Sequence, residues 1–142
     1  MFRKYHYLNT DLNATAKCYV MTANDNLAAF MAIITFPHPV RSYKKVHRLV
    51  VLPDYQGLGL GTLFLNHIAA MYKYPFSITT SQPALIHGLA KNDKWMCINN
   101  TKTTRNHKYH SKLGVQLNKT LSNKRIISTF VYKDSIKYSK TK

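Results

Sequence analysis

The stretch that decides the fold runs from Val46 to Thr62 and reads VHRLVVLPDYQGLGLGT. Its first part, up to Leu52, is dense in Val and Leu, which predicts a buried strand that Pro53 and Asp54 end. Its second part carries alternating glycines directly before a segment of helical periodicity. A glycine-rich turn at a helix start presents backbone N–H groups to an anion, and the helix dipole adds partial positive charge. The stretch therefore predicts a strand, a phosphate-binding loop and a helix.

The glycines Gly57, Gly59 and Gly61 fit other phosphate motifs poorly. No Lys-Ser/Thr pair follows them, as a Walker A loop requires, and the third glycine is misplaced for the dinucleotide pattern G-x-G-x-x-G. No acidic residue lies about 20 positions further on, where a dinucleotide fold needs one for the ribose. A bare G-x-G-x-G is most often a turn without a ligand. The elements around it must therefore show whether this turn binds a phosphate.

The flanking sequence predicts a mixed α/β domain. The first helix carries apolar residues at helical spacing, Leu63, Phe64, Ile68 and Met71, and Pro75 closes the segment. The predicted elements are a hairpin of strands at 17–22 and 27–36 around the turn 24–26, the strand 46–52, the first helix from Gly61, a strand at 76–80, a second helix from Pro83 and a last strand at 125–132.

The second helix takes its apolar face from Ala84, Leu85 and Leu89, and Trp95 could extend that face. A lone aromatic beside a helix is usually a hydrophobic anchor, so this role is expected for Trp95 rather than that of a stacking platform. Two strands joined by a crossover helix should lie parallel. After Cys97 the sequence NNTKTTRNHKYHSK is polar and basic without an apolar period, which predicts a loop.

We expect one domain over residues 1–142, with a core at about 17–132 and a basic tail at 133–142 that frays. The longest apolar stretch, 27–34, is far short of the roughly 20 residues of a membrane helix, and the polar first residues contain no signal-peptide apolar region. These features predict a cytoplasmic protein that does not associate with a membrane.

The number and spacing of cysteines and histidines argue against a disulfide framework and against a metal-binding site. Cys18 and Cys97 are expected to be reduced and largely buried thiols. Cys97, His107 and His110 fall short of the four ligands of a structural zinc site, so no metal is expected.

The charge is strongly positive and uneven. The chain has 21 Lys+Arg against 5 Asp+Glu, a formal net charge of +16 and no Glu. Residues 1–90 contribute +5 (8 basic, 3 acidic), and residues 91–142 contribute +11 (13 basic, 2 acidic). Two interpretations stay open: a solvated basic surface, or a polyanion site in the C-terminal third built on residues 102–112 with Lys119, Lys124 and Arg125.

Beyond these patterns, the chain resembles the GNAT superfamily of acetyltransferases. The resemblance rests on the loop Q/R-x-x-G-x-G/A, here Gln56 to Gly61, after a strand ending in V-x-P-x-Y, and on the order of elements from about Lys17 to Tyr132. More narrowly, HRLVVLPDYQGLGLG, TSQPALIHGL and RIISTFVY look like a little-characterised bacterial and phage branch.

This resemblance implies a mostly antiparallel sheet with a splayed central parallel strand pair and flanking helices. The family has one or two helices before its hairpin, and this chain has only about sixteen residues there. The N-terminal helices are therefore reduced, and either the enzyme is minimal or a second subunit, as in a homodimer, or other residues complete the cleft.

The resemblance also implies an acetyl-CoA site with no metal. Backbone groups of β-strand residues would border the pantetheine arm, and loop amides would hold the pyrophosphate. These cofactor-binding positions are Leu49, Val50 and Val51 on the strand, and Gln56, Gly57, Leu58, Gly59, Leu60, Gly61 and Thr62 in the loop and first helical turn.

Catalytic candidates are fewer because the usual groups are missing. The family base is often a Glu on the strand before the loop, whereas here His47 lies two residues before Leu49, and strand alternation puts both on one face. A histidine, with a pKa of about 6.5, can accept a proton near neutrality, although a core histidine is an equal alternative. Gly88 stands where relatives carry a Tyr acid, which leaves His87, Tyr109 or water for that role.

Two functions follow as hypotheses. The first is an N-acetyltransferase that moves the acetyl group of acetyl-CoA to a primary amine, on a protein or an aminoacyl-RNA. The second is a nucleic-acid-binding module on a catalytically weak or inactive GNAT scaffold, which the charge and the missing Glu and Tyr would suit. Fold alone does not decide between them.

Overall fold

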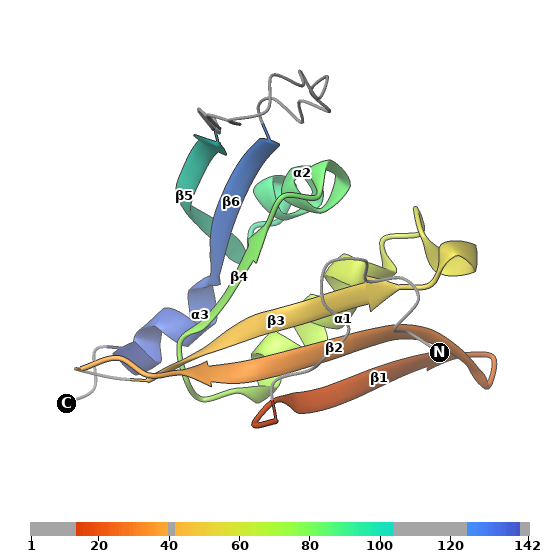
Figure 1. The fold of residues 1–142 in the computed structure, drawn as a ribbon, viewed down its shortest axis with the longest axis horizontal. Helices are drawn as coiled ribbons and strands as arrows, with labels where there is room; N and C mark the ends of the chain where they lie inside the picture. The colour runs from red at the N-terminus through yellow and green to blue at the C-terminus, as the bar shows by residue number, and fades with distance from the viewer. Residues whose placement is uncertain (1–13, 40–41, 104–124, 140–142) are drawn as a thin grey trace, which may run out of the picture.

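The computed structural model describes residues 14–39, 42–103 and 125–139. Over these residues one six-stranded sheet runs in the order β1-β2-β3-β4-β6-β5 (Figure 1). Neighbouring strands pair antiparallel except β3 and β4, which are parallel. The elements are β1 (Lys17–Ala23), β2 (Asn26–Phe36), β3 (Tyr43–Val51), a 3-10 helix (Pro53–Tyr55), α1 (Leu60–Met71), β4 (Phe76–Thr80), α2 (Pro83–Lys91), β5 (Trp95–Thr103), β6 (Arg125–Tyr132), α3 (Lys133–Ile136) and a 3-10 helix (Lys137–Ser139). The mixed, mostly antiparallel α/β fold with one central parallel pair is confirmed.

The hairpin of β1 and β2 forms where its turn residues predict it. Asn24 and Asp25 have φ angles of 50° and 62°, in the left-handed region that these residue types tolerate. Two left-handed central residues give a turn whose twist matches that of the flanking strands. The sequence therefore locates this turn correctly.

The parallel strands β3 and β4 pair only at their starts. Lys44 lies opposite Phe76 and Lys45 opposite Ser77, and the Lys44 amide donates to the Pro75 carbonyl at 2.8 Å. Beyond these pairs the strands diverge, and in Figure 1 the group β4, β6 and β5 stands at a steep angle to β1, β2 and β3. This splay is what the family resemblance implies.

A single core joins the two halves of the sheet. Its buried members come from both helices and from β2 to β6, and Leu65 and Phe76 are fully buried within it. Burying side chains of this size contributes about 1.5–3 kcal/mol each, so the core holds α1 and the splayed strands in one unit.

The predicted apolar face of α1 is partly wrong. Leu63 and Met71 are 59% and 57% exposed, whereas Leu65 and Ala69 are buried beside Phe64. The helix carries apolar residues around more than half of its circumference, so periodicity alone leaves two stripes to choose from. Packing against the sheet selects one of them.

The prediction of a loop after Cys97 is wrong for residues 98–103, because β5 continues to Thr103. β6 supplies a partner along the whole length of β5, from Trp95 opposite Tyr132 to Thr103 opposite Arg125. Polar residues such as Asn and Thr have no apolar period, yet they fill an edge strand when a neighbouring strand provides the hydrogen bonds. β3 likewise begins at Tyr43, earlier than predicted, because Tyr43 pairs with Phe36 of β2.

The tail and the cysteines also differ from expectation. Residues 133–139 are helical rather than frayed, since Ser135 is buried and its hydroxyl bridges the Tyr132 carbonyl and the Phe76 amide. Cys18 and Cys97 are free thiols, but both are exposed because both lie on edge strands.

Trp95 starts β5 and is not part of the second helix, which ends at Lys91. It is 4% exposed, and its indole Nε1 donates to Asn66 Oδ1 of α1 at 2.7 Å. Its ring packs edge-on against Tyr132 with centroids 5.3 Å apart. The expectation of a hydrophobic anchor is therefore confirmed.

Candidate functional site

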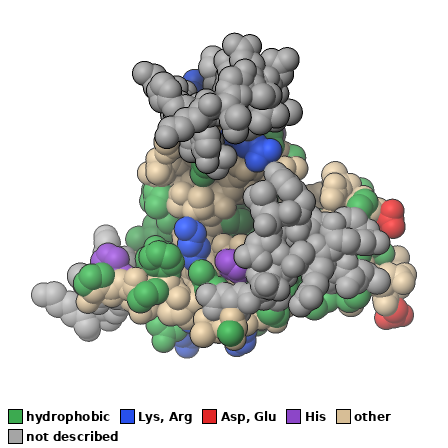
Figure 2. All heavy atoms as spheres, in the orientation of Figure 1, with side chains coloured by type: hydrophobic (Ala, Val, Ile, Leu, Met, Phe, Trp, Pro, Cys, Tyr) green, Lys and Arg blue, Asp and Glu red, His purple; other side chains and the backbone are tan. Residues whose placement is uncertain are grey.

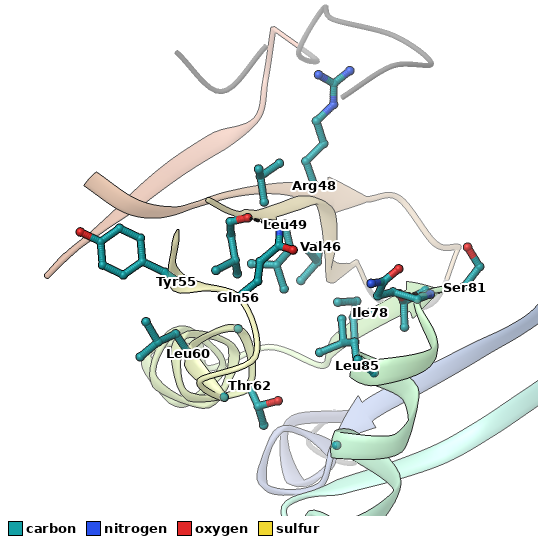
Figure 3. Close-up of a pocket in the computed structure, with 18 of the residues that line it drawn as sticks. Val46, Arg48, Leu49, Tyr55, Gln56, Leu60, Thr62, Ile78, Ser81 and Leu85 are labelled. Carbon is teal, nitrogen blue, oxygen red and sulfur yellow. Dashed lines mark hydrogen bonds between the residues drawn. The ribbon is translucent and has the colours of Figure 1, made fainter. Parts of the chain in front are cut away.

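A cleft of about 830 Å³ opens where β3 and β4 diverge (Figure 3). Its walls are the separated half of β3, the glycine loop with the start of α1, the end of β4, and α2. In Figure 3, Leu60 and Thr62 lie on one side of the cleft, and Ile78, Ser81 and Leu85 lie on the other. Two stretches of the chain, 46–62 and 78–88, thus build one site.

The glycine loop leaves open space where a ligand would lie. Gly57 and Gly59 have φ angles of 80° and 75°, the left-handed region that favours glycine. A methyl group placed on either residue would meet no protein atom within 4 Å. Backbone conformation, and not crowding by the protein, therefore requires glycine at these two positions.

Helix α1 begins at this loop with its amides uncapped. Gly59 is the N-cap, no side chain caps the helix, and the first turn has no acidic residue. The first helical bond runs from the Leu63 amide to the Gly59 carbonyl at 3.1 Å, and the preceding amides have no carbonyl one turn back to accept from them. Such a helix start, with its partial positive charge, suits an anion such as a pyrophosphate.

Gln56 shapes the loop through its side chain. Its Nε2 donates to the Val51 carbonyl at 2.8 Å, which ties the loop to the end of β3 (Figure 3). Only backbone roles are expected for the loop from the sequence. The side-chain hydrogen bond gives a structural reason for a Gln at the first position of the Q-x-x-G-x-G pattern.

Two further glycines let the helices approach their neighbours. A Cβ on Gly61 would lie 3.5 Å from Val51 Cγ2, an ordinary contact that brings α1 close to β3. A Cβ on Gly88 would lie 3.3 Å from Thr62 Oγ1, which is tight. A Tyr at position 88, as in many relatives of the family, would have to displace Thr62 or turn away from it.

His47 lies at a β-bulge, which changes the predicted alternation. Ala32 pairs with Arg48 and Ile33 with Val46, so His47 is the extra residue of β3. Because of the bulge, Val46 shares the core-facing side with Leu49, and His47 is exposed while lining the cleft. The alternative of a core histidine is therefore wrong. His47 and Leu49 both line the cleft, although the bulge interrupts the strict alternation from which their common face was predicted.

The cleft collects most of the predicted site residues. Leu58, which is 68% exposed, and His87, which is exposed on α2, do not line it. Tyr109 lies outside the described residues, so its position relative to the cleft is not described. The predicted residues that line the cleft are His47, Leu49, Val50, Val51, Gln56, Gly57, Gly59, Leu60, Gly61 and Thr62.

Sequence reasoning missed Arg48 and the segment between β4 and α2. Arg48 is only 8% exposed, borders the cleft, and in Figure 3 extends from β3 on the side away from the helices. Thr80 and Gln82 also line the cleft, and the Gln82 amide donates to Thr80 Oγ1 at 3.1 Å ahead of α2. The bulge that puts Arg48 on the side of β3 away from the helices leaves no mark in the sequence, whereas Thr-x-Gln-Pro before a helix is a recognisable start signal.

Residues 14–39, 42–103 and 125–139 contain no group of three or more His, Cys, Asp or Glu side chains arranged to hold a metal ion. No helix in these ranges is long and apolar enough to cross a membrane. His107, His110 and most of the basic segment 102–112 lie outside them.

Comparison with known proteins decides the family. The acetyltransferase (GNAT) domain family matches residues 14–114, well over half of the chain. The chain belongs to the GNAT acetyltransferase family. No protein in a search of curated sequences matches it.

Solved GNAT structures share the fold of this GNAT domain. A GNAT-family acetyltransferase from Streptococcus pneumoniae has a TM-score of 0.54 at 14% identity, covering 82% of this chain and 65% of that one. A Bacillus subtilis acetyltransferase in complex with CoA has a TM-score of 0.54 at 16% identity, covering 83% and 76%. Arabidopsis thaliana Naa50, in complex with the bisubstrate analogue CoA-Ac-MVNAL, has a TM-score of 0.51 at 14% identity, covering 80% and 70%. At these identities the likeness concerns the fold, and the domain spans 65% of the length of the pneumococcal protein.

Proposed function

We propose that this GNAT domain transfers the acetyl group of acetyl-CoA to a primary amine. The observation that carries the proposal is the uncapped start of α1 behind two left-handed glycines, which opens into the cleft between β3 and β4. In this proposal the amides from Gln56 to Thr62 bind the pyrophosphate, although Leu58 contributes only its backbone. The CoA bound by the Bacillus subtilis acetyltransferase supports the same ligand here.

The separated half of β3 suits the pantetheine arm. Leu49, Val50 and Val51 lie beyond the last pair with β4, so the β4 side of β3 borders the cleft instead of a strand there. In this proposal, backbone groups on that side bond an amide-bearing arm as a strand partner would, and donate to the thioester oxygen as negative charge develops on it.

The chemistry requires a neutral amine at the thioester carbon. As the new C–N bond forms and the C–S bond breaks, the amine loses a proton and the departing thiolate gains one. His47, exposed at the bulge and lining the cleft, is the residue we propose as the acceptor of the amine proton. His87 lies outside the cleft lining, so water is the better-placed proton donor to the thiolate.

Release of free thiol from acetyl-CoA tests the proposal. The full chain should release thiol faster with an amine acceptor than in buffer alone, and a panel of peptide N-terminal amines, lysine peptides, polyamines and aminoacyl-RNA should contain at least one such acceptor. The bisubstrate analogue bound by Naa50 makes peptide N-termini the first to try. Acetyl-CoA binding without turnover on any acceptor would instead favour the second hypothesis, a scaffold that has lost transfer activity.

A further inference from the structure

The cleft between β3 and β4 is closed at the end where the two strands still pair. The last pair of the two strands is Lys45 with Ser77. Val46 and Ile78 follow directly, at the point where the strands separate. Both belong to the buried core and border the cleft, which places them on the side of the sheet that α1 and α2 cover. The closed end of the cleft is therefore apolar on its helix side.

Two leucines continue this apolar lining. Leu49 of β3 and Leu85 of α2 are half-buried, pack against the core and border the cleft. In Figure 3, Ile78 and Leu85 lie together across the open space from Leu49. We call the four side chains the apolar wall: Val46, Leu49, Ile78 and Leu85. A space between facing apolar side chains favours an apolar ligand group, because binding there removes hydrocarbon from water.

Small residues of α2 give a ligand access to this wall. Of the helix residues Pro83–Lys91, all of them described, only Ala84, Leu85 and Gly88 border the cleft. Gly88 has no side chain, and a Cβ there would lie 3.3 Å from Thr62 Oγ1 of α1. The cleft therefore reaches the backbone of α2 beside Leu85.

The charged groups of the cleft do not belong to the apolar wall. Among the described residues that line the cleft, only His47 and Arg48 have side chains that carry charge near neutral pH. Arg48 extends from β3 on the side away from the helices (Figure 3). Figure 2, in which α1 lies behind the sheet as in Figure 1, shows basic and histidine side chains on the surface where the two parts of the sheet meet. The uncharged wall disfavours a ligand group that carries a carboxylate.

We propose that the apolar wall binds neutral, unbranched acyl groups longer than acetyl, so that the site takes propionyl-CoA and butyryl-CoA as well as acetyl-CoA. The inference rests on the proposed function, in which the pyrophosphate lies at the start of α1 and the pantetheine arm lies along residues 49–51. An arm in that position runs from the loop towards Val46, so its thioester end faces the wall. The acceptor amine takes the exposed side of the cleft at His47, which leaves the apolar end to the acyl chain.

Calorimetric titration of the full chain with acetyl-, butyryl- and succinyl-CoA, without an acceptor, tests the inference. Each methylene that the wall buries strengthens binding by up to about fourfold, so butyryl-CoA should bind up to about 15-fold more tightly than acetyl-CoA. Succinyl-CoA, whose acyl chain ends in a carboxylate, should bind more weakly than either.

The possible outcomes separate this inference from the proposed function. Acetyl-CoA binding with weaker binding of butyryl-CoA, or succinyl-CoA binding as tightly as butyryl-CoA, would overturn the inference and leave acetyl transfer standing. Binding of none of the three would overturn both.

Two neighbouring residues of α2 give a matched pair of variants. Leu85→Asn puts an amide into the apolar wall, and Ile86→Asn makes the same kind of change at a half-buried residue that packs on the core but does not border the cleft. The ratio of butyryl-CoA to acetyl-CoA affinity is taken within each protein, so a lower folded fraction cancels.

The ratio should fall by up to about 15-fold in Leu85→Asn and stay at the value of the unchanged protein in Ile86→Asn. An unchanged ratio in Leu85→Asn, or an equal fall in both variants, would overturn the inference. If Leu85→Asn does not fold, the three donors on the unchanged protein still decide.

Discussion

Single residues in the loop act through different physical means. Gln56 ties the loop to β3 by a side-chain bond to the Val51 carbonyl, whereas Gly57 and Gly59 supply left-handed backbone that other residues adopt at a cost. Gly61 has no left-handed backbone that requires glycine, and a methyl group there would make an ordinary contact with Val51. The family pattern allows Gly or Ala at this third position, which agrees with that contact.

His47 is the residue whose proposed role is easiest to separate from structure. If it accepts the amine proton, His47→Gln should lower kcat by roughly 100-fold or more and leave acetyl-CoA affinity nearly intact. Turnover of the unchanged protein should rise with pH through one ionisation near neutrality, because only the neutral imidazole accepts a proton, and the variant should lose that rise.

The control is His38→Gln, a change at another exposed histidine that lies outside the cleft lining. Steady-state kinetics over pH 5.5–9 with one acceptor amine would compare the three proteins. An unchanged kcat and pH profile in His47→Gln would remove His47 from the reaction.

Among the elements, the short helix α3 and β4 are coupled by one buried hydroxyl. The Phe76 amide donates to Ser135 Oγ at 3.0 Å, and Ser135 is 1% exposed. Ser135→Ala leaves that buried amide without its acceptor, so we expect a loss of about 1–3 kcal/mol in the free energy of unfolding, measured by urea denaturation.

An exposed hydrogen bond gives the matched control. Thr79 and Thr129 share a bond of 3.0 Å between their hydroxyls on the surface of β4 and β6, and Thr79→Val should change stability by no more than about 0.5 kcal/mol. A loss from Ser135→Ala no larger than the loss from Thr79→Val would contradict the coupling of α3 to β4 through this hydroxyl.

Strands and helices were predictable wherever local chemistry is decisive. Asn24-Asp25 located the hairpin turn, and Pro83 and the strand 125–132 were placed correctly because turn formers and β-branched runs act locally. β5 was missed beyond Cys97 because its Asn and Thr residues form a strand only when β6 pairs with them. The tail was missed because its helix depends on a bond to Phe76, far away in sequence.

The site shows the same division between local and distant causes. The loop from Gln56 to Gly61 was recognisable because its glycines and the helix after it are contiguous. The bulge at His47 was not, since it depends on how Ala32 and Ile33 of β2 pair with Arg48 and Val46 of β3. Sequence reasoning thus finds the proposed cofactor loop more readily than the surroundings of the proposed catalytic histidine.

At the scale of the whole molecule, the cleft exists because the sheet splays while one core holds its halves together. β3 and β4 separate after two pairs, and α1 and α2 pack on the same buried cluster on either side of the opening. A ligand that binds only this assembled cleft must stabilise the whole fold, by about 2.7 kcal/mol at 100 times its Kd. Binding and unfolding therefore report on the same site.

Calorimetric titration of acetyl-CoA into Gly59→Asp tests the central claim most directly. Asp tolerates the left-handed backbone at this position, so the variant should fold, but its carboxylate would lie where the pyrophosphate binds at the start of α1. Gly59→Asn, which adds a similar side chain without charge, should weaken binding less, and Gly61→Ala should bind as the unchanged protein does. The account predicts no measurable acetyl-CoA binding to folded Gly59→Asp; affinity equal to that of the unchanged protein would contradict it.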